Sequence, residues 1–269
     1  MLFFIGLGLY DEKGITTEGL EIARKADKVY LELYTSLMPG LTISKLENML
    51  GKKVIILRRR DIEGEKAYEI LKEALEKNVV LLVPGDPFVA TTHIHLRLEA
   101  KRRNIKTRVI HAASILSAIP GETGLFSYKF GRSVTITFPH GEFISETAYD
   151  VIKENYERGL HTLLLLDIDA ESKRFMSIRE ALEILLLIEE RRKEKVISNE
   201  TLVVGLARLG APDAIVKADF LSNIIEYPFG PPPYSIVIPG KLHFIEAEAL
   251  VLLADAPKSI LKIGRDERR

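Results

Sequence analysis

Solid apolar runs alternate along this chain with segments of helical periodicity. The runs "NVVLLV" (residues 78–83) and "HTLLLLD" (161–167) contain four or more consecutive apolar residues, as in strands that are buried on both faces of a sheet. Between such runs, apolar residues recur every three or four positions, as Ile70, Leu71 and Ala74 do, which is typical of amphipathic helices. Strands covered by helices on both faces define the α/β class, and the pattern predicts two α/β domains.

One segment interrupts the alternation. The stretch "PGETGLFSYKFG" (120–131) contains a proline and three glycines, as expected of a loop or linker. A second series of strands and helices follows it. We therefore predict an N-terminal α/β domain over residues 1–122 and a C-terminal α/β domain over residues 123–269, which the chain length accommodates.

Two Ser-x-x-Glu sequences have the spacing of a capping box, in which the serine and the glutamate satisfy each other's free backbone amides. They are Ser44 with Glu47 and Ser177 with Glu180. Each predicts that a helix begins at its serine.

Composition narrows the function classes. Lys and Arg together number 38, as do Asp and Glu, so the net charge is zero and neither nucleic acid nor an anionic membrane is expected as the main partner. The chain has no cysteine, which excludes disulfides, zinc–thiolate sites and a cysteine nucleophile. The start "MLFFIGLGLYDEKG" lacks a basic segment and a cleavage site, so it predicts a first strand and not a signal peptide. With 28% charged residues, the composition fits a heat-adapted cytoplasmic protein.

Two loops stand where α/β sheets bind ligands, at the carboxyl ends of strands. The first, Gly6-Leu7-Gly8-Leu9, has the G-x-G of a dinucleotide fingerprint but no third glycine, so it is a tight turn or a loop that lets a ligand approach the backbone. The second, "PGDP" (84–87), combines two rigid prolines, a permissive glycine and the carboxylate of Asp86. It predicts a preformed ligand loop, with a rigid turn capped by Asp86 as the alternative.

Other polar residues give weaker indications. Asp167-Ile168-Asp169 follows a strand and could hold a divalent metal with a sugar nucleotide. His93 and His95 would point to different faces of a helix, so they form a poor metal pair. The remaining histidines are interpreted as structural or surface residues. No catalytic triad, zinc-protease or lipase motif is present, which favours a reaction that depends on positioning, and no catalytic residue can be named.

Three segments together resemble the diphthine synthase family of the tetrapyrrole methylase-like group. They are "FIGLGLYDEKGIT", "PGDPFVATTH" and "HAASILSAIPGETGL", and further matches such as "GLHTLLLLDI" and "LVVGLARLG" extend the resemblance over nearly the whole chain.

The resemblance implies two α/β domains with a cleft between them for S-adenosylmethionine, which becomes S-adenosylhomocysteine, and no metal. It implies a homodimer from an archaeon. The substrate would be translation elongation factor 2 carrying an aminocarboxypropyl-histidine, whose amino group is methylated to the trimethylated diphthine in diphthamide biosynthesis.

The family's cofactor contacts can be transferred by motif. The family pattern has alanine where Leu209 stands and histidine where Tyr234 stands. Both differences are tolerable if the cofactor is held through backbone groups, whereas a contact through the histidine side chain would be weakened at Tyr234. The full set of expected cofactor contacts is Leu9, Asp86, Val89, Ser114, Ile115, Leu166, Leu209 and Tyr234.

Three alternatives remain open from the sequence. One is a tetrapyrrole (corrin) methyltransferase with the same methyl donor. Another is a metal-dependent sugar-nucleotide transferase that uses Asp167 and Asp169. The third is a non-catalytic module that binds the translation machinery.

Overall fold

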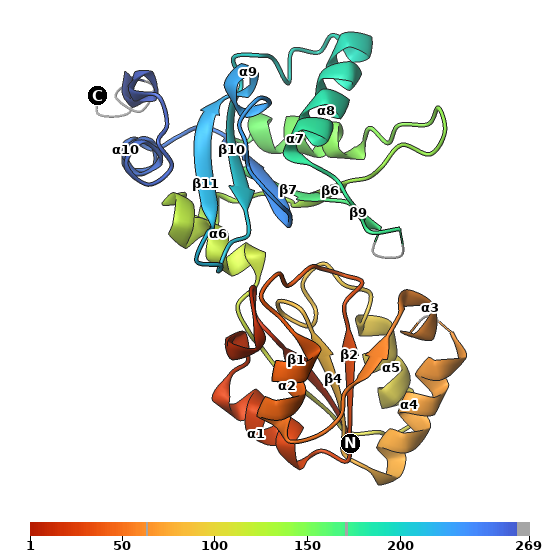
Figure 1. Cartoon of the computed structure of the whole chain (residues 1–269). Coiled ribbons are helices and arrows are strands. Elements are labelled where there is room, and N and C mark those ends of the chain that lie inside the picture. The colour runs from red at the N-terminus through yellow and green to blue at the C-terminus, as the bar shows by residue number, and fades with distance from the viewer. Residues whose placement is uncertain (63, 170–171, 263–269) are drawn as a thin grey trace. The chain divides into compact units, whose positions relative to one another are not determined.

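The computed structural model describes every residue except 63, 170–171 and 263–269. The chain divides into two compact units (Figure 1). The first unit holds residues 1–116 with Ser172, and the second holds the other described residues from Ser117 onward. The division falls inside helix α6 (Ile115–Thr123), and the boundary expected from the sequence lies at the other end of the same helix.

The first unit is built on a five-stranded parallel sheet. Its central strands β1 (Leu2–Gly6) and β4 (Val79–Val83) are buried along their whole length, as their solid apolar sequences predict. Gly6 of β1 is in register with Val83 of β4, so these two strands end at the same edge. The strand order is β3 (Ile55–Leu57), β2 (Lys28–Glu32), β4 (Val79–Val83), β1 (Leu2–Gly6) and β5 (Thr107–Ile110).

Helices cover both faces of this sheet (Figure 1). Leu2 and Phe4 of β1 lie in one apolar cluster with residues of α4 and α5, whereas Phe3 and Ile5 lie in another with residues of α1 and α2. Alternate residues of one strand thus serve two cores, which confirms the α/β class. The helices are α1 (Thr17–Lys25), α2 (Ile43–Leu50), α3 (Arg59–Ile62), α4 (Glu65–Glu76), α5 (Ile94–Arg102) and the 3₁₀ turn η1 (Glu12–Gly14).

The second unit has a mixed sheet. Strands β6 (Val134–Ile136) and β7 (Thr162–Leu166) are parallel, and all other neighbours in this sheet are antiparallel. Most residues of the edge strand β11 are half-buried, so its sequence has no solid apolar run. The sequence pattern therefore did not indicate this strand. The strand order is β11 (Ile215–Phe220), β10 (Leu202–Ala207), β12 (Tyr234–Ile238), β7 (Thr162–Leu166) and β6 (Val134–Ile136), with a separate hairpin of β8 (Ile168–Asp169) and β9 (Arg174–Phe175).

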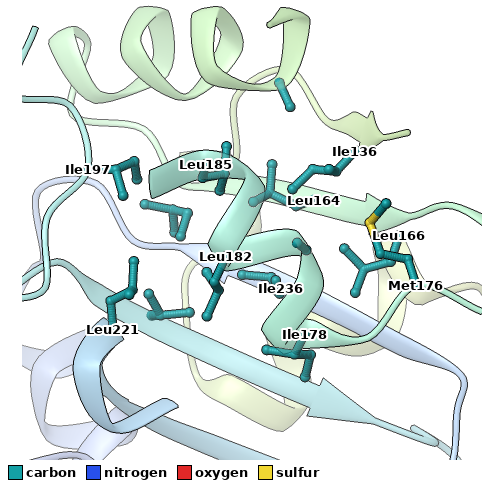
Figure 2. Packing of buried hydrophobic residues seen from close by; sticks show 14 of the residues in the cluster. Ile136, Leu164, Leu166, Met176, Ile178, Leu182, Leu185, Ile197, Leu221 and Ile236 are labelled. Carbon is teal, nitrogen blue, oxygen red and sulfur yellow. The ribbon is translucent and has the colours of Figure 1, made fainter. Parts of the chain in front are cut away.

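One face of this sheet packs against the helices α7 (Thr147–Glu157) and α8 (Ile178–Arg192). Figure 2 shows Leu182 and Leu185 of α8 lying among the strand residues Leu164 and Ile236. Burial of such side chains is the main source of stability, at about 1.5–3 kcal/mol each. The helices of this unit are α6, α7 (Thr147–Glu157), α8 (Ile178–Arg192), α9 (Leu221–Ile224), α10 (Phe244–Leu253) and the 3₁₀ turn η2 (Ser127–Lys129).

Two local predictions were wrong. The loop expected from Pro120 begins later, because α6 continues to Thr123 with Pro120 inside it. Proline removes one helical hydrogen bond, but the hydroxyl of Thr123 donates to the carbonyl of Ile119 and both residues are buried. The helix expected to begin at Ser44 begins one residue earlier, at Ile43, with Thr42 as its N-cap. Glu47 instead accepts a hydrogen bond from the amide of Val54.

The other capping box is confirmed, and it supports a matched prediction. Ser177 accepts from the amide of Glu180, whose carboxylate accepts from the amide of Ser177. We expect Ser177→Ala to lower the free energy of unfolding by about 1 kcal/mol. Thr42→Ala is the control, because the Thr42 side chain makes no capping bond and should change stability by a few tenths of a kcal/mol at most. Denaturant titration of both variants checks this, and equal losses would contradict it.

Among the described residues, no helix is long and apolar enough to cross a membrane.

Candidate functional site

Three loops meet at the carboxyl edge of the sheet in the first unit, because the strands β4, β1 and β5 that they follow are neighbours. Gly8 and Gly85 join two of these loops with a pair of backbone hydrogen bonds of 2.7 and 3.3 Å. Both glycines have a positive φ, of 75° and 67°, which other residues rarely adopt. The two loops are therefore rigid and bring bare backbone close together.

Gly6 lies where the third loop joins. A Cβ atom at this position would overlap the carbonyl oxygen of Gly85 and lie 2.7 Å from the Cβ of Ala112. Only glycine lets the loops after β4 and β5 close on the end of β1. The first glycine of the G-x-G pattern therefore serves the close packing of three loops, a role that neither sequence interpretation, the tight turn or the ligand-approach loop, included.

Asp86 is at the centre of this edge and its carboxylate has two partners. Oδ1 accepts from the amide of Phe88 at 3.2 Å, and Oδ2 lies 2.6 Å from Nδ1 of His111. The Asp86 side chain is only 10% exposed, whereas that of His111 is 74% exposed. The aspartate thus ties its own loop to the first residue after β5.

His93 holds the same loop from beneath. It is fully buried, its Nδ1 lies 3.1 Å from the carbonyl oxygen of Pro87, and its Nε2 lies 3.3 Å from the hydroxyl of Tyr34. A carbonyl only accepts, so Nδ1 carries the proton and Nε2 accepts from Tyr34 in the neutral ring. Both nitrogens are therefore occupied by the fold.

Glu32 is a structural residue of the neighbouring loop. It is fully buried, and it accepts from the amides of Tyr34 and Thr35 and from the hydroxyl of Thr35. Burial raises the pKa of its carboxyl, against the opposing effects of His93 and of these hydrogen bonds. Glu32 therefore supports the backbone of the loop that follows β2.

Four of the five predicted contacts of the first unit belong to these three loops, and the fifth, Ile115, begins helix α6 directly after the third loop. Asp86 and Ser114 are buried, and the three apolar side chains are half-buried. Half-buried apolar residues beside bare backbone suit a ligand that has both apolar and polar parts. The apolar three are Leu9, Val89 and Ile115.

The three predicted contacts of the second unit also lie at one sheet edge. Leu166 ends β7, Tyr234 begins the antiparallel neighbour β12, and Leu209 follows the end of β10. Ala207 of β10 is in register with Tyr234, which brings the three positions together. The sequence order alone does not show this, because the strands are far apart along the chain.

Arg208 organises this second edge, although no motif in the sequence indicated a role for it. Its guanidinium donates to the carboxylate of Asp213 at 2.7 Å and to the carbonyl oxygen of Phe229 at 2.7 Å, and also to that of Pro231. Its side chain is only 5% exposed. The hydroxyl of Tyr234 donates to the carbonyl of Gly230 in the same loop, so the tyrosine side chain is already used inside the unit.

Asp167 supports the backbone near the end of β7. Its two carboxylate oxygens accept from the amides of Phe138 and Ile168, at 2.9 and 3.0 Å. Within the described part of the chain, no group of three or more His, Asp or Glu side chains is placed to hold a metal ion. The D-x-D pattern therefore has a structural explanation at its first aspartate.

Comparison with known proteins gives one consistent result. Residues 1–225 match the family described as Tetrapyrrole (Corrin/Porphyrin) Methylases. The chain is 50% identical over 264 residues to a diphthine synthase of Methanocella arvoryzae, and the alignment covers 98% of this chain and 100% of that protein. It is 47% identical to a diphthine synthase of Methanocaldococcus jannaschii, with 95% of this chain and 99% of that protein covered. A crystal structure of diphthine synthase superposes with a TM-score of 0.88 at 42% identity and covers 97% of this chain and 99% of its own.

Proposed function

The chain belongs to the tetrapyrrole methylases and, among them, to the diphthine synthases, and from this membership we propose the reaction that it performs. It is an S-adenosylmethionine-dependent methyltransferase of diphthamide biosynthesis. It methylates the amino group of the aminocarboxypropyl-histidine of translation elongation factor 2, up to the trimethylated diphthine. The proposal includes a homodimer and a reaction without metal.

The structural observation that carries the proposal is the joined pair of loops in the first unit. Gly8 and Gly85 lock the G-x-G loop to the "PGDP" loop beside the carboxylate of Asp86. A preformed wall of this kind lowers the ordering cost of binding a small ligand.

The residues at this wall fit S-adenosylmethionine. A cationic sulfonium is complemented by the negative Asp86, and the half-buried Leu9, Val89 and Ile115 suit its apolar parts. No Cβ blocks the backbone at Gly85, where a built Cβ would have the Cβ of Ser114 as its nearest neighbour at 4.0 Å. We propose these residues as cofactor contacts, together with Leu166, Leu209 and Tyr234 of the second unit.

When bound, S-adenosylmethionine supplies a methyl group from its sulfonium by in-line displacement. The protein's task is to hold the acceptor amine in line at about 3 Å, to exclude water and to keep the amine neutral. No developing oxyanion needs stabilisation, which agrees with a site that lacks hydrolase motifs.

Intact-mass spectrometry tests the proposal. Elongation factor 2 bearing the unmethylated histidine extension is incubated with this protein and S-adenosylmethionine in the presence of a metal chelator. We expect a stepwise mass increase of up to three methyl groups, mapped to that histidine. Binding of the cofactor without any mass increase would contradict the substrate and favour a tetrapyrrole acceptor. Tight binding to the factor without turnover would favour a non-catalytic module.

A further inference from the structure

His111 and His93 hold the same loop but differ in what remains free. His93 is buried and both of its ring nitrogens have partners in the fold. In His111 only Nδ1 has a partner in the fold, and it lies 2.6 Å from Oδ2 of Asp86. Within the described residues, Nε2 of His111 has no hydrogen-bond partner, and the side chain is 74% exposed. His111 therefore presents one nitrogen to solvent at the edge where the methyl donor is proposed to bind.

The contact with Asp86 determines which nitrogen that is. An ionised carboxylate only accepts hydrogen bonds, so Nδ1 of His111 carries a proton in both protonation states of the ring. In the neutral ring the lone pair is then on Nε2, the exposed atom. A carboxylate that orients an imidazole and supports its cationic form is the arrangement by which histidines act as general bases.

The reaction needs a base. The acceptor amine is mostly protonated at neutral pH, and an ammonium has no lone pair with which to attack a methyl group. Conversion of one ammonium to a trimethylammonium releases three protons, so the need recurs in each round.

We propose that His111 is a general base for the methylation, oriented by Asp86; this assignment rests on the proposed function. Nε2 takes the proton of the substrate ammonium, and the electron pair of the broken N–H bond stays on the amine nitrogen. That pair forms the new N–C bond as the S–C bond breaks onto sulfur. The imidazolium then releases its proton to water before the next round.

The first test does not depend on turnover. Nuclear magnetic resonance of enzyme with ¹⁵N-labelled histidine reports the tautomer of each ring. We expect neutral His111 to carry its proton on Nδ1, and we expect this preference to be lost in Asp86→Asn. A neutral His111 protonated on Nε2 would overturn the assignment, because the exposed nitrogen would then have no lone pair.

The second test compares His111→Ala with His95→Ala. His95 is also exposed, lies on α5, and has no recorded side-chain partner among the described residues. At neutral pH we expect His111→Ala to lower kcat by about 100-fold or more, with the Kd for S-adenosylmethionine measured by calorimetry within about threefold of wild type. The deficit should shrink as the pH approaches the pKa of the amine, and added imidazole should restore part of the rate.

The outcomes separate the two proposals. A wild-type protein that does not methylate the factor overturns the proposed function and the assignment with it. An active wild type with an equally active His111→Ala variant overturns the assignment alone. The assignment is also overturned if kcat of the His111→Ala variant falls by the same ratio at every pH and its affinity for S-adenosylmethionine falls as well. His111 would then only support the loop.

Discussion

Replacing Gly6 by alanine is expected to weaken binding of S-adenosylmethionine by tenfold or more, which corresponds to about 1.4 kcal/mol. The new Cβ would overlap the carbonyl oxygen of Gly85 and crowd the Cβ of Ala112 at 2.7 Å. Both neighbours are short and belong to the main chain or to a single-carbon side chain, so neither can rotate away. The loops after β4 and β5 must separate, at a stability cost of about 1–3 kcal/mol.

Calorimetry of cofactor binding and denaturant titration measure the two effects. Gly121→Ala is the matched control, because a Cβ at Gly121 of α6 meets nothing within 4 Å and its φ is not positive. Alanine there should keep or slightly raise stability, since glycine is a poor helix former. If Gly6→Ala binds the cofactor as tightly as wild type does, the three loops are not the wall that we describe.

Glu246→Ala is expected to lower the free energy of unfolding of the second unit by about 3–5 kcal/mol. Glu246 is fully buried and ties together two segments that are far apart in the sequence. Its carboxylate contacts Nε2 of His161 at 2.9 Å, accepts from the amides of Phe126 and His243 at 2.8 Å each, and pairs with Lys129. Truncation leaves all four donors without this acceptor inside the protein, which is the costly outcome for a buried charge.

Hydrogen exchange at the amides of β7 and β12 measures this loss within the second unit itself. Glu226→Ala is the control, because Glu226 pairs with Arg179 and the side chains are 67% and 46% exposed. Exposed pairs of this kind contribute at most about 1 kcal/mol. Similar effects of the two substitutions would contradict the role that we assign to the buried network.

Glu246 also makes the stability of the fold depend on pH. Burial alone would raise the pKa of Glu246, but hydrogen bonds from His161, Lys129 and two backbone amides outweigh burial and lower it to about 2. A lowered pKa stabilises the fold above the ordinary value of 4.5, and this contribution is lost as the pH falls toward about 2. We therefore expect the wild-type protein to lose stability across that interval and the Glu246→Ala variant to lose less, by the contribution of this one buried carboxylate.

The candidate site was predictable in its loops but not in its interactions. The prolines, glycine and aspartate of "PGDP" mark a rigid loop wherever they occur, because their backbone preferences are local. That Gly8 pairs with Gly85 depends on β1 and β4 being neighbours, and strand order is not written in any single segment. His111 was interpreted as a structural or surface histidine for the same reason, since nothing near it in the sequence indicates that Asp86 lies 2.6 Å away.

The sequence by itself determined the class of the fold and the elements with a strong local pattern. Strands β1 and β4, and the capping box at Ser177, follow from apolar periodicity and from hydrogen bonds within a few residues. The tertiary structure alone decided which elements are neighbours. It placed half-buried β11 at a sheet edge, brought Tyr234 beside Ala207, and paired Glu246 with His161. These outcomes depend on the packing of distant segments, and the free energy of that packing is not contained in any local stretch of the chain.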